Sequence, residues 1–344
     1  MTDWQNVMGH EWAVQMLRDS LQHGRNGHAY LITGPDQVGK TTLARAFAQA
    51  LNCTGQADSS CGPGHLCRVC TLIAHDRHPD VRLVEPEVSG RGKLTLKIET
   101  IRQLQQELNL SAYEARYKVA ILKRFDAATI GASNAFLKTL EEPPARVVLI
   151  LTANDADTLL PTISSRCRTL NLRPLPTDLI EQSLTTRWRV DEDTAHLLAH
   201  LADGRLGWAV RAAQDPAVLQ ERATHLAQLQ EALAGNRVRR FQLADKLANK
   251  PEAAPAVLQT WVSWWRDVNL LAQSGGRGTA VSLTAGVTNI DQLDTMRQIA
   301  HTTPDTAVLA SLKQTTLALW QLEHNANGRL VLENLFLTYP YLSS

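Results

Sequence analysis

The chain has 344 residues, of which 44% are hydrophobic and 20% are charged. These proportions are those of ordinary globular proteins, and they exclude a disordered, collagenous or fibrous chain. Its 35 Lys and Arg and 34 Asp and Glu leave a net charge of +1. That balance neither requires nor excludes a nucleic-acid partner, because a basic surface would be local. At about 100–200 residues per domain, the length predicts two or three domains.

The sequence offers no membrane or export signal. No run approaches the roughly 18 apolar residues of a membrane span, and residues 1–6 lack the basic and apolar regions of a secretory signal. We therefore expect a cytoplasmic protein with no membrane partner. Four of the five cysteines lie between Cys53 and Cys70. In a reducing compartment such a cluster indicates a metal site rather than disulfides.

The first half of the chain alternates short aliphatic runs with helical periodicity. Five runs predict strands, at residues 29–33, 81–85, 118–122, 147–152 and 169–172. Between them, apolar residues recur every three or four positions, as in helices that pack on a sheet. They are Leu43, Phe47 and Leu51, and then Ile101, Leu104 and Leu108. The pattern predicts an α/β domain with a mostly parallel sheet.

Two prolines in residues 173–176 predict a domain boundary, because proline fits neither a helix interior nor a central strand. Helical patterning replaces strand-like runs after that point, and a second proline interruption occurs near residue 250. We therefore expect an α/β domain over residues 1–175 and two all-α domains over 176–247 and 248–344.

Residues 34–41, Gly-Pro-Asp-Gln-Val-Gly-Lys-Thr, match the phosphate-loop pattern G-x-x-x-x-G-K-[ST] at every defined position. The motif follows a predicted strand and opens an amphipathic helix, which is the context that the pattern requires. Gly34 and Gly39 let backbone N–H groups face the phosphates, and the helix N-terminus favours their negative charge. We expect Lys40 at the β and γ phosphates and Thr41 at Mg²⁺. ATP or ADP is the expected ligand.

A hydrolysing phosphate-loop protein also needs an acid at the end of a neighbouring strand to hold Mg²⁺. The third predicted strand ends instead in Lys123 and Arg124, so we expect a degenerate Mg²⁺ site and little or no hydrolysis. Asp126 lies three residues beyond Lys123, about 10 Å along an extended strand and on the opposite face, so we expect it to be a poor substitute. The alternative is an acid after the fourth predicted strand, but Asn154 there suits a polar sensor of the γ-phosphate better.

These features resemble a clamp-loader subunit of bacterial DNA polymerase III, a member of the AAA+ family. The resemblance is carried by the phosphate loop, by residues 134–144 (Asn-Ala-Phe-Leu-Lys-Thr-Leu-Glu-Glu-Pro-Pro) and by Ser164-Ser165-Arg166-Cys167. Residues 7–10 are similar to the segment that lines the family's adenine pocket, and residues 325–333 to the end of its helical collar. The resemblance implies an AAA+ domain followed by a helical lid and a collar through which subunits assemble.

Within this family, the missing acid pair favours the delta-prime type, which does not hydrolyse ATP. Gly207 stands where motor subunits carry a sensor arginine, although Arg205 is a candidate replacement. By resemblance, Arg166 is an arginine finger offered in trans to ATP on a motor subunit, where it stabilises transition-state charge. The implied partners are gamma/tau and delta subunits in a heteropentamer, the sliding clamp and primer-template DNA. Two alternatives stay open: an ATP-hydrolysing gamma/tau-type motor and a free-standing nucleotide-binding switch.

The four clustered cysteines are spaced C-x7-C-x5-C-x2-C directly after the phosphate-loop helix: Cys53, Cys61, Cys67 and Cys70. Four thiolates complete a closed tetrahedral site for a structural Zn²⁺. The spacing resembles the zinc module of bacterial loader subunits, except that the family commonly has a shorter middle gap. His65 is the substitute ligand if one cysteine fails, and a set of unligated buried cysteines is the alternative.

Two further clusters are expected to be structural. Three tryptophans in residues 261–265 recur on one side of a helix, so we expect them in the core. Three arginines in residues 237–240 are expected to form a solvated basic face.

Overall fold

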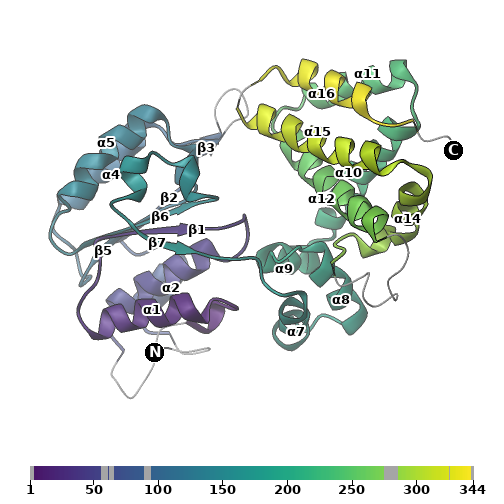
Figure 1. Ribbon diagram of the computed structural model, residues 1–344. Helices are drawn as coiled ribbons and strands as arrows, with labels where there is room; N and C mark the ends of the chain where they lie inside the picture. The colour runs from purple at the N-terminus through teal and green to yellow at the C-terminus, as the bar shows by residue number, and fades with distance from the viewer. Residues whose placement is uncertain are drawn as a thin grey trace. The chain divides into compact units, whose positions relative to one another are not determined.

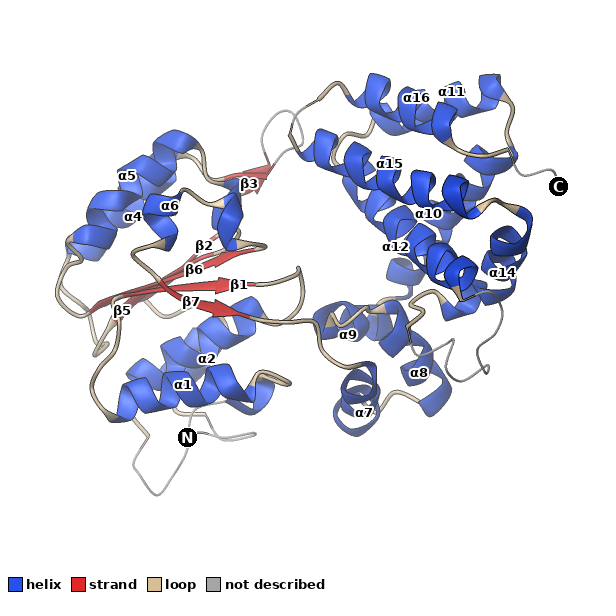
Figure 2. Ribbon diagram, in the orientation of Figure 1, coloured by secondary structure: helices blue, strands red, loops and turns tan. Residues whose placement is uncertain are grey.

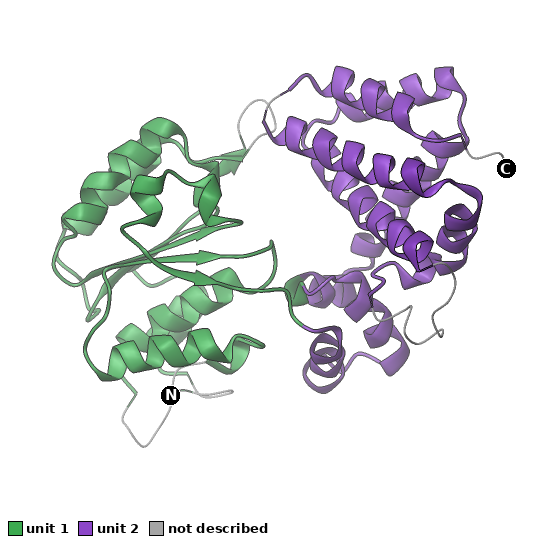
Figure 3. Cartoon of the chain, in the orientation of Figure 1, with its two compact units in different colours: residues 1–175, 205–207 green, residues 176–204, 208–344 purple. Residues whose placement is uncertain are grey.

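A computed structural model describes residues 4–55, 61, 66–88, 94–274, 286–324 and 326–341. The chain divides into two compact units (Figure 3). Unit 1 contains residues 1–175 and 205–207, and unit 2 contains residues 176–204 and 208–344. The chain passes from the first unit to the second between Leu175 and Pro176, within the segment whose prolines predict a boundary. No helix among the described residues has the length and apolar character needed to cross a lipid bilayer.

Unit 1 is built on a five-stranded sheet in the order β2-β5-β6-β1-β7, and every pair of neighbours is parallel. Its strands are Ala29–Thr33 (β1), Val81–Val84 (β2), Lys118–Leu122 (β5), Val147–Ala153 (β6) and Arg168–Asn171 (β7). Each lies within one residue of its predicted position. The whole of β1 and β6 is buried, because helices cover both faces of the sheet. The expected α/β fold class is confirmed. A short antiparallel pair, Glu87–Val88 (β3) and Leu94–Thr95 (β4), is not indicated by the sequence.

Two layers of helices enclose this sheet (Figures 1 and 2). One layer holds Glu11–Gln22 (α1), Lys40–Asn52 (α2) and Arg68–Ala74 (α3), and the other holds Ile98–Asn109 (α4), Ile130–Glu141 (α5) and Pro161–Ser164 (α6). Successive residues of a strand face opposite layers. Tyr30 and Ile32 of β1 therefore belong to the core under α2, and Leu31 belongs to the core under α5. The predicted apolar stripes of α2 and α4 are buried in these cores.

Unit 2 is helical. Its helices are Thr177–Trp188 (α7), Glu192–Leu201 (α8), Leu206–Gln214 (α9, whose first two residues belong to unit 1), Pro216–Ala234 (α10), Arg237–Ala248 (α11), Ala254–Gln273 (α12), Leu293–Thr302 (α14), Asp305–Glu323 (α15) and Gly328–Thr338 (α16). The tryptophan stripe of α12 is confirmed as core, since Trp261, Trp264 and Trp265 are at most 1% exposed. Side chains of α10 and α11 share that core, so the division expected at residue 247 does not separate two cores. The three-domain organisation stays a prediction.

Arg240 departs from the expected solvated face. Arg237 and Arg239 are exposed, but Arg240 is only 1% exposed. Its guanidinium donates to the carbonyl oxygens of Phe336 at 2.7 Å and Tyr339 at 2.9 Å. The last carbonyls of a helix have no partner within that helix. Arg240 therefore caps the end of α16, and this tertiary role leaves no signal in the local sequence.

Candidate phosphate-binding and metal sites

The phosphate loop connects the carboxyl end of β1 to the first residue of α2. Gly34 and Gly39 have φ values of +137° and +116°, which favour glycine. A Cβ atom on Gly34 would lie 2.3 Å from the carbonyl oxygen of Leu172. The N–H of Gly34 donates to the carbonyl of Asn154 at 3.1 Å. The loop is therefore held against β6 and the segment after β7, at a distance that only glycine permits.

Lys40 begins α2, and its ammonium lies inside the loop. Nζ donates to the carbonyl oxygens of Gly34 at 2.5 Å and Pro35 at 2.9 Å, and to Oδ1 of Asn154 at 3.2 Å. Burial lowers the pKa of Lys40, and the nearby carboxylate of Asp36 opposes this shift. The structure thus brings together the loop lysine and Asn154. Thr41 follows in the first turn of the same helix.

His10 contacts the backbone of the phosphate loop, a role that the sequence did not indicate. Its imidazole is buried, and Nε2 lies 3.1 Å from the carbonyl oxygen of Val38. Burial lowers the pKa of His10, so the ring is neutral near pH 7, and Nε2 must carry the proton that Val38 accepts. The only sequence signal is its place in the segment that resembles the family's adenine pocket.

The residues after β5 leave the extended conformation that the sequence analysis assumed. Lys123 forms an ion pair with Glu85, which follows β2 on the side of β5 away from β6. Arg124 has a left-handed φ of +48°, and its N–H donates to Oγ1 of Thr152 on β6 at 3.1 Å. The chain then forms the 3-10 helix Phe125–Ala127 (η2). The expectation for Asp126 is therefore wrong in its geometry, because the strand ends before that residue.

Asp126 lies within electrostatic reach of the phosphate loop. Its side chain is 15% exposed, and its Oδ2 is 3.8 Å from Nη2 of Arg124. Burial raises the pKa of Asp126, while the positive charges of Arg124 and Lys40 lower it. The same carboxylate in turn raises the pKa of Lys40. Among the described residues, its buried Oδ1 has no hydrogen-bond partner.

Arg166 lies two residues after α6, at the surface of unit 1. Its Nη2 is 2.7 Å from Oε1 of Glu141, and its Nη1 donates to the carbonyl of Thr162 at 2.9 Å. Glu141 is the last residue of α5 and belongs to the motif at residues 134–144. Two segments that carry the family resemblance therefore meet at this ion pair.

The structure brings the four clustered cysteines together. All four sulfur atoms lie within 4.8 Å of one another, so the group can hold a metal ion. Cys53 caps the C-terminus of α2, Cys67 is the N-cap of α3, and Cys70 lies in the first turn of α3. The sulfurs of Cys53 and Cys61 are 3.4 Å apart; tetrahedral Zn–thiolate bonds of about 2.3 Å require a sulfur spacing of about 3.8 Å. The substitute ligand His65 falls outside the described residues.

Backbone N–H groups point at the sulfurs of this cluster. The N–H of Cys67 donates to Sγ of Cys61 at 3.1 Å, and the N–H of Cys70 donates to Sγ of Cys67 at 3.5 Å. Burial alone would raise the pKa of Cys67, but hydrogen bonds from Cys70 and Thr54 outweigh it and lower the pKa to about 6. Burial instead raises the pKa of Cys61 and of Cys70, so among these three thiols only Cys67 is held in the deprotonated form that binds a metal.

Gly207 lies against the phosphate loop within unit 1. Its N–H donates to the carbonyl oxygen of Gln37 at 2.9 Å. A Cβ atom on Gly207 would lie 2.8 Å from that oxygen. The position that the sequence aligns with a sensor arginine therefore accepts a larger side chain only if the loop moves.

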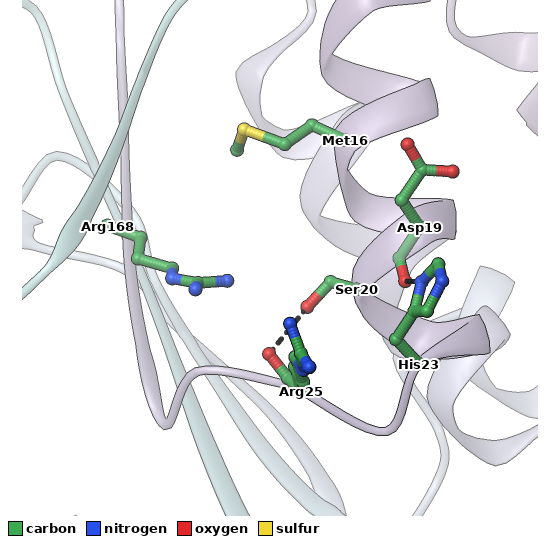
Figure 4. A pocket seen from close by; sticks show the side chains of 6 residues that line it. All are labelled: Met16, Asp19, Ser20, His23, Arg25 and Arg168. Atoms are coloured by element: carbon green, nitrogen blue, oxygen red, sulfur yellow. Dashed lines mark hydrogen bonds between the residues drawn. The ribbon is translucent and has the colours of Figure 1, made fainter.

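A separate hollow of about 240 Å³ lies between α1 and the first residue of β7 (Figure 4). It is lined by Met16, Asp19, Ser20, His23, Arg25 and Arg168. The Oγ of Ser20 donates to the carbonyl of Arg25, and Nδ1 of His23 bonds the carbonyl of Asp19. Because Arg168 begins its strand, the hollow is at the amino edge of the sheet, whereas the phosphate loop is at the carboxyl edge.

The fold and the loop together define a class of protein. A phosphate loop after the first strand, a polar residue after the adjacent strand and a parallel sheet covered on both faces characterise a P-loop nucleotide-binding domain. Residues 9–176 match the family model described as "DNA polymerase III, delta subunit". Over about half of its length the chain is therefore similar to clamp-loader subunits of bacterial DNA polymerase III.

Individual relatives include two types of subunit. The DNA polymerase III subunit delta' of Bacillus subtilis (strain 168) is 33% identical over 190 residues, which are 55% of this chain and 55% of the relative. The DNA polymerase III subunit tau of Salmonella typhimurium is 36% identical over 208 residues, which are 58% of this chain and 31% of the relative. The matches thus span about half or less of these relatives, and they do not separate the two types.

Solved structures that match the chain superpose on it poorly. A gamma subunit-related protein of DNA polymerase III from Thermotoga maritima is 17% identical, with 93% of this chain and 97% of that chain covered and a TM-score of 0.42. The clamp loader delta protein of Bacillus subtilis is 11% identical, with 94% and 98% covered and a TM-score of 0.33.

Proposed function

We propose that this chain is a delta-prime-type subunit of the clamp loader, which binds nucleotide without hydrolysing it. It would assemble in the cytoplasm with gamma/tau and delta subunits in a heteropentamer that opens the sliding clamp and loads it onto primer-template DNA. The observation that carries this assignment is the pair Lys123 and Arg124 after β5, where a motor needs acids. Because both residues are cations, neither can orient an attacking water. The side chain of Lys123 is paired with Glu85.

The phosphate loop supports binding of ATP or ADP. Gly34 and Gly39 give the loop its shape, and Lys40 and Asn154 already meet inside it. Thr41 would supply a hydroxyl ligand for Mg²⁺. The cysteine cluster would hold one structural Zn²⁺ beside this domain, since four thiolates leave no open position for catalysis.

Arg166 would act on a neighbouring motor subunit. It is 36% exposed, and its guanidinium makes contacts with only a surface carboxylate and a carbonyl among the interactions described above. A guanidinium placed at the γ-phosphate of a neighbour stabilises the charge of the transition state. The contribution of this chain to ATP hydrolysis would therefore appear only in the assembled loader.

A gamma/tau-type motor is the second candidate, because the tau relative is 36% identical and the delta' relative 33% identical. Reconstitution with purified delta, gamma/tau and clamp separates the two. We expect the isolated chain to show no steady-state hydrolysis, and its omission from the mixture to lower the clamp- and DNA-stimulated ATPase. Intrinsic hydrolysis that disappears in Lys40→Ala would instead assign the motor function.

A further inference from the structure

The strand order places the end of β5 beside the phosphate loop. β6 lies between β5 and β1, so the carboxyl ends of the three strands share one edge of the sheet. Asn154 after β6 reaches Lys40, and the backbone of Arg124 after β5 is bonded to Thr152 of β6. The turn after β5 is therefore separated from the loop lysine, which follows β1, by the width of the single strand β6.

The left-handed conformation of Arg124 determines which side chain after β5 lies near the phosphate loop. Its φ of +48° ends the strand and starts η2, so Asp126 does not continue along the line of β5, and its carboxylate lies close enough to Lys40 to interact with it electrostatically. Lys123 is drawn to the opposite side of β5 by Glu85. Of the charged side chains in this turn, Arg124 and Asp126 stay near the loop, which itself contributes Asp36 and Lys40.

The carboxylate of Asp126 is incompletely paired. One oxygen, Oδ1, is buried without a hydrogen-bond partner among the described residues; the carboxylate otherwise has a hydrogen bond to its own backbone N–H and the charge of Arg124, whose Nη2 lies 3.8 Å from Oδ2. A buried carboxylate normally requires hydrogen bonds or a cation, because desolvation is costly. Carboxylate and hydroxyl oxygens are also the ligands that Mg²⁺ prefers.

We propose, on the basis of the nucleotide binding proposed above, that Asp126 is the metal carboxylate of this phosphate loop and that it holds the Mg²⁺ of a bound nucleotide together with Thr41. Arg124 is the counter-ion of Asp126 when no metal is bound. Asp126 would replace the acid that is expected at Lys123, three residues earlier, because the strand ends and the chain turns at Arg124. Binding of Mg²⁺ and hydrolysis are thereby separated, because no second acid stands at Lys123 or Arg124 to orient water.

The test uses the isolated full chain, with fluorescent mant-ADP titrated in Mg²⁺ and in EDTA. We expect Mg²⁺ to tighten binding by about 10-fold or more, the range typical of metal-site changes. Asp126→Asn should abolish that increment and leave the affinity in EDTA unchanged. Asp155→Asn is the matched control, since it removes an exposed carboxylate that follows β6 at the same edge of the sheet. It should retain the Mg²⁺ dependence of the wild-type chain.

Three results would overturn the assignment: equal affinities in Mg²⁺ and EDTA for the wild-type chain, a full Mg²⁺ increment in Asp126→Asn, or no nucleotide binding at all. If Asp126→Asn also weakens binding in EDTA, Asp126→Glu decides, since restored Mg²⁺ dependence supports the carboxylate role and its absence contradicts it. Arg166→Ala should change none of these values. Failure of the metal assignment is therefore distinguishable from failure of the finger role, which appears only in the assembled loader.

Discussion

Arg166 and Glu141 form an ion pair on the surface of unit 1, with 2.7 Å between Nη2 and Oε1. Side chains exposed by 36% and 51% gain little from such a pair, about 0–1 kcal/mol in comparable proteins. A phosphate group that approaches Arg166 can therefore displace Glu141 at little cost. The ion pair orients the guanidinium in the isolated chain but is weak enough to be broken by a competing anion.

Removal of the Arg166 guanidinium should affect the loader and not this chain. We expect Arg166→Ala to keep its fold, its metal content and its assembly, and to lower the clamp- and DNA-stimulated ATPase of the reconstituted complex. The loss at the affected motor site should be about 10³–10⁵-fold, and the total loss should be partial because other sites keep their own arginines. Glu141→Gln is the control that removes the ion pair alone, and it should retain activity. Unchanged ATPase and clamp loading in Arg166→Ala would show an ordinary surface arginine.

The cysteine cluster should contain one Zn²⁺ per chain after purification without chelator. Cys67→Ser should release the metal and lower the thermal unfolding temperature, because ligation free energy is folding free energy. Metal content by mass spectrometry and a thermal melt measure the two effects. Cys167→Ser is the matched control: this cysteine lies outside the cluster, and burial raises its pKa to about 12. Protein with no stoichiometric zinc would remove the metal from the proposed function.

Asp80 should make the stability of the chain depend on acidic pH. Its buried carboxylate accepts from the N–H groups of Tyr113, Glu114 and Ala115 at 2.8–3.0 Å. Burial raises the pKa of Asp80, but these hydrogen bonds outweigh it, and the net pKa is lower than in the unfolded chain. The stabilisation is therefore complete above the unfolded pKa of about 3.9 and is lost as pH falls through the lower folded pKa.

Urea unfolding of Asp80→Asn at several pH values tests whether ionised Asp80 stabilises the fold. The variant should be less stable than wild type by about 2–3 kcal/mol near neutral pH, since hydrogen bonds to a charged group are lost. The difference should shrink as pH falls below about 4. A difference that is constant with pH would exclude ionisation of Asp80 as the cause.

Arg240 should matter far more for stability than its exposed neighbours. Arg240→Met leaves the carbonyl oxygens of Phe336, Tyr339 and Pro340 without this donor, and we expect a loss in the free energy of unfolding of about 1–3 kcal/mol for each oxygen that stays buried and unpaired. Arg239→Met should change it by at most about 0.5 kcal/mol, as is usual for surface substitutions. Thermal unfolding of the two variants side by side provides the measurement. Equal effects would mean that the cap on α16 contributes little.

Much of unit 1 could be predicted because its strands are buried on both faces and appear as continuous apolar runs, as β6 does. The phosphate loop was equally accessible, since its residues are contiguous. The position of Asp126 was not, because it depends on a left-handed turn at Arg124, a non-glycine residue whose φ no local pattern indicates. Arg240 was misjudged for a related reason: its acceptors lie about a hundred residues away in the sequence.

Helix α2 joins two kinds of chemistry that the chain keeps about 20 Å apart, since 13 residues rise by about 1.5 Å each. Lys40 stands at one end, and Cys53 follows the other. Near the cysteine end, Gln49 donates to the carbonyl of Cys70, and Asn52 exchanges hydrogen bonds with the backbone of Tyr117. Hydrogen bonds to other parts of unit 1 thus fix both ends of α2. The same helix therefore fixes the position of both the Lys40 ammonium and the first cysteine of the cluster.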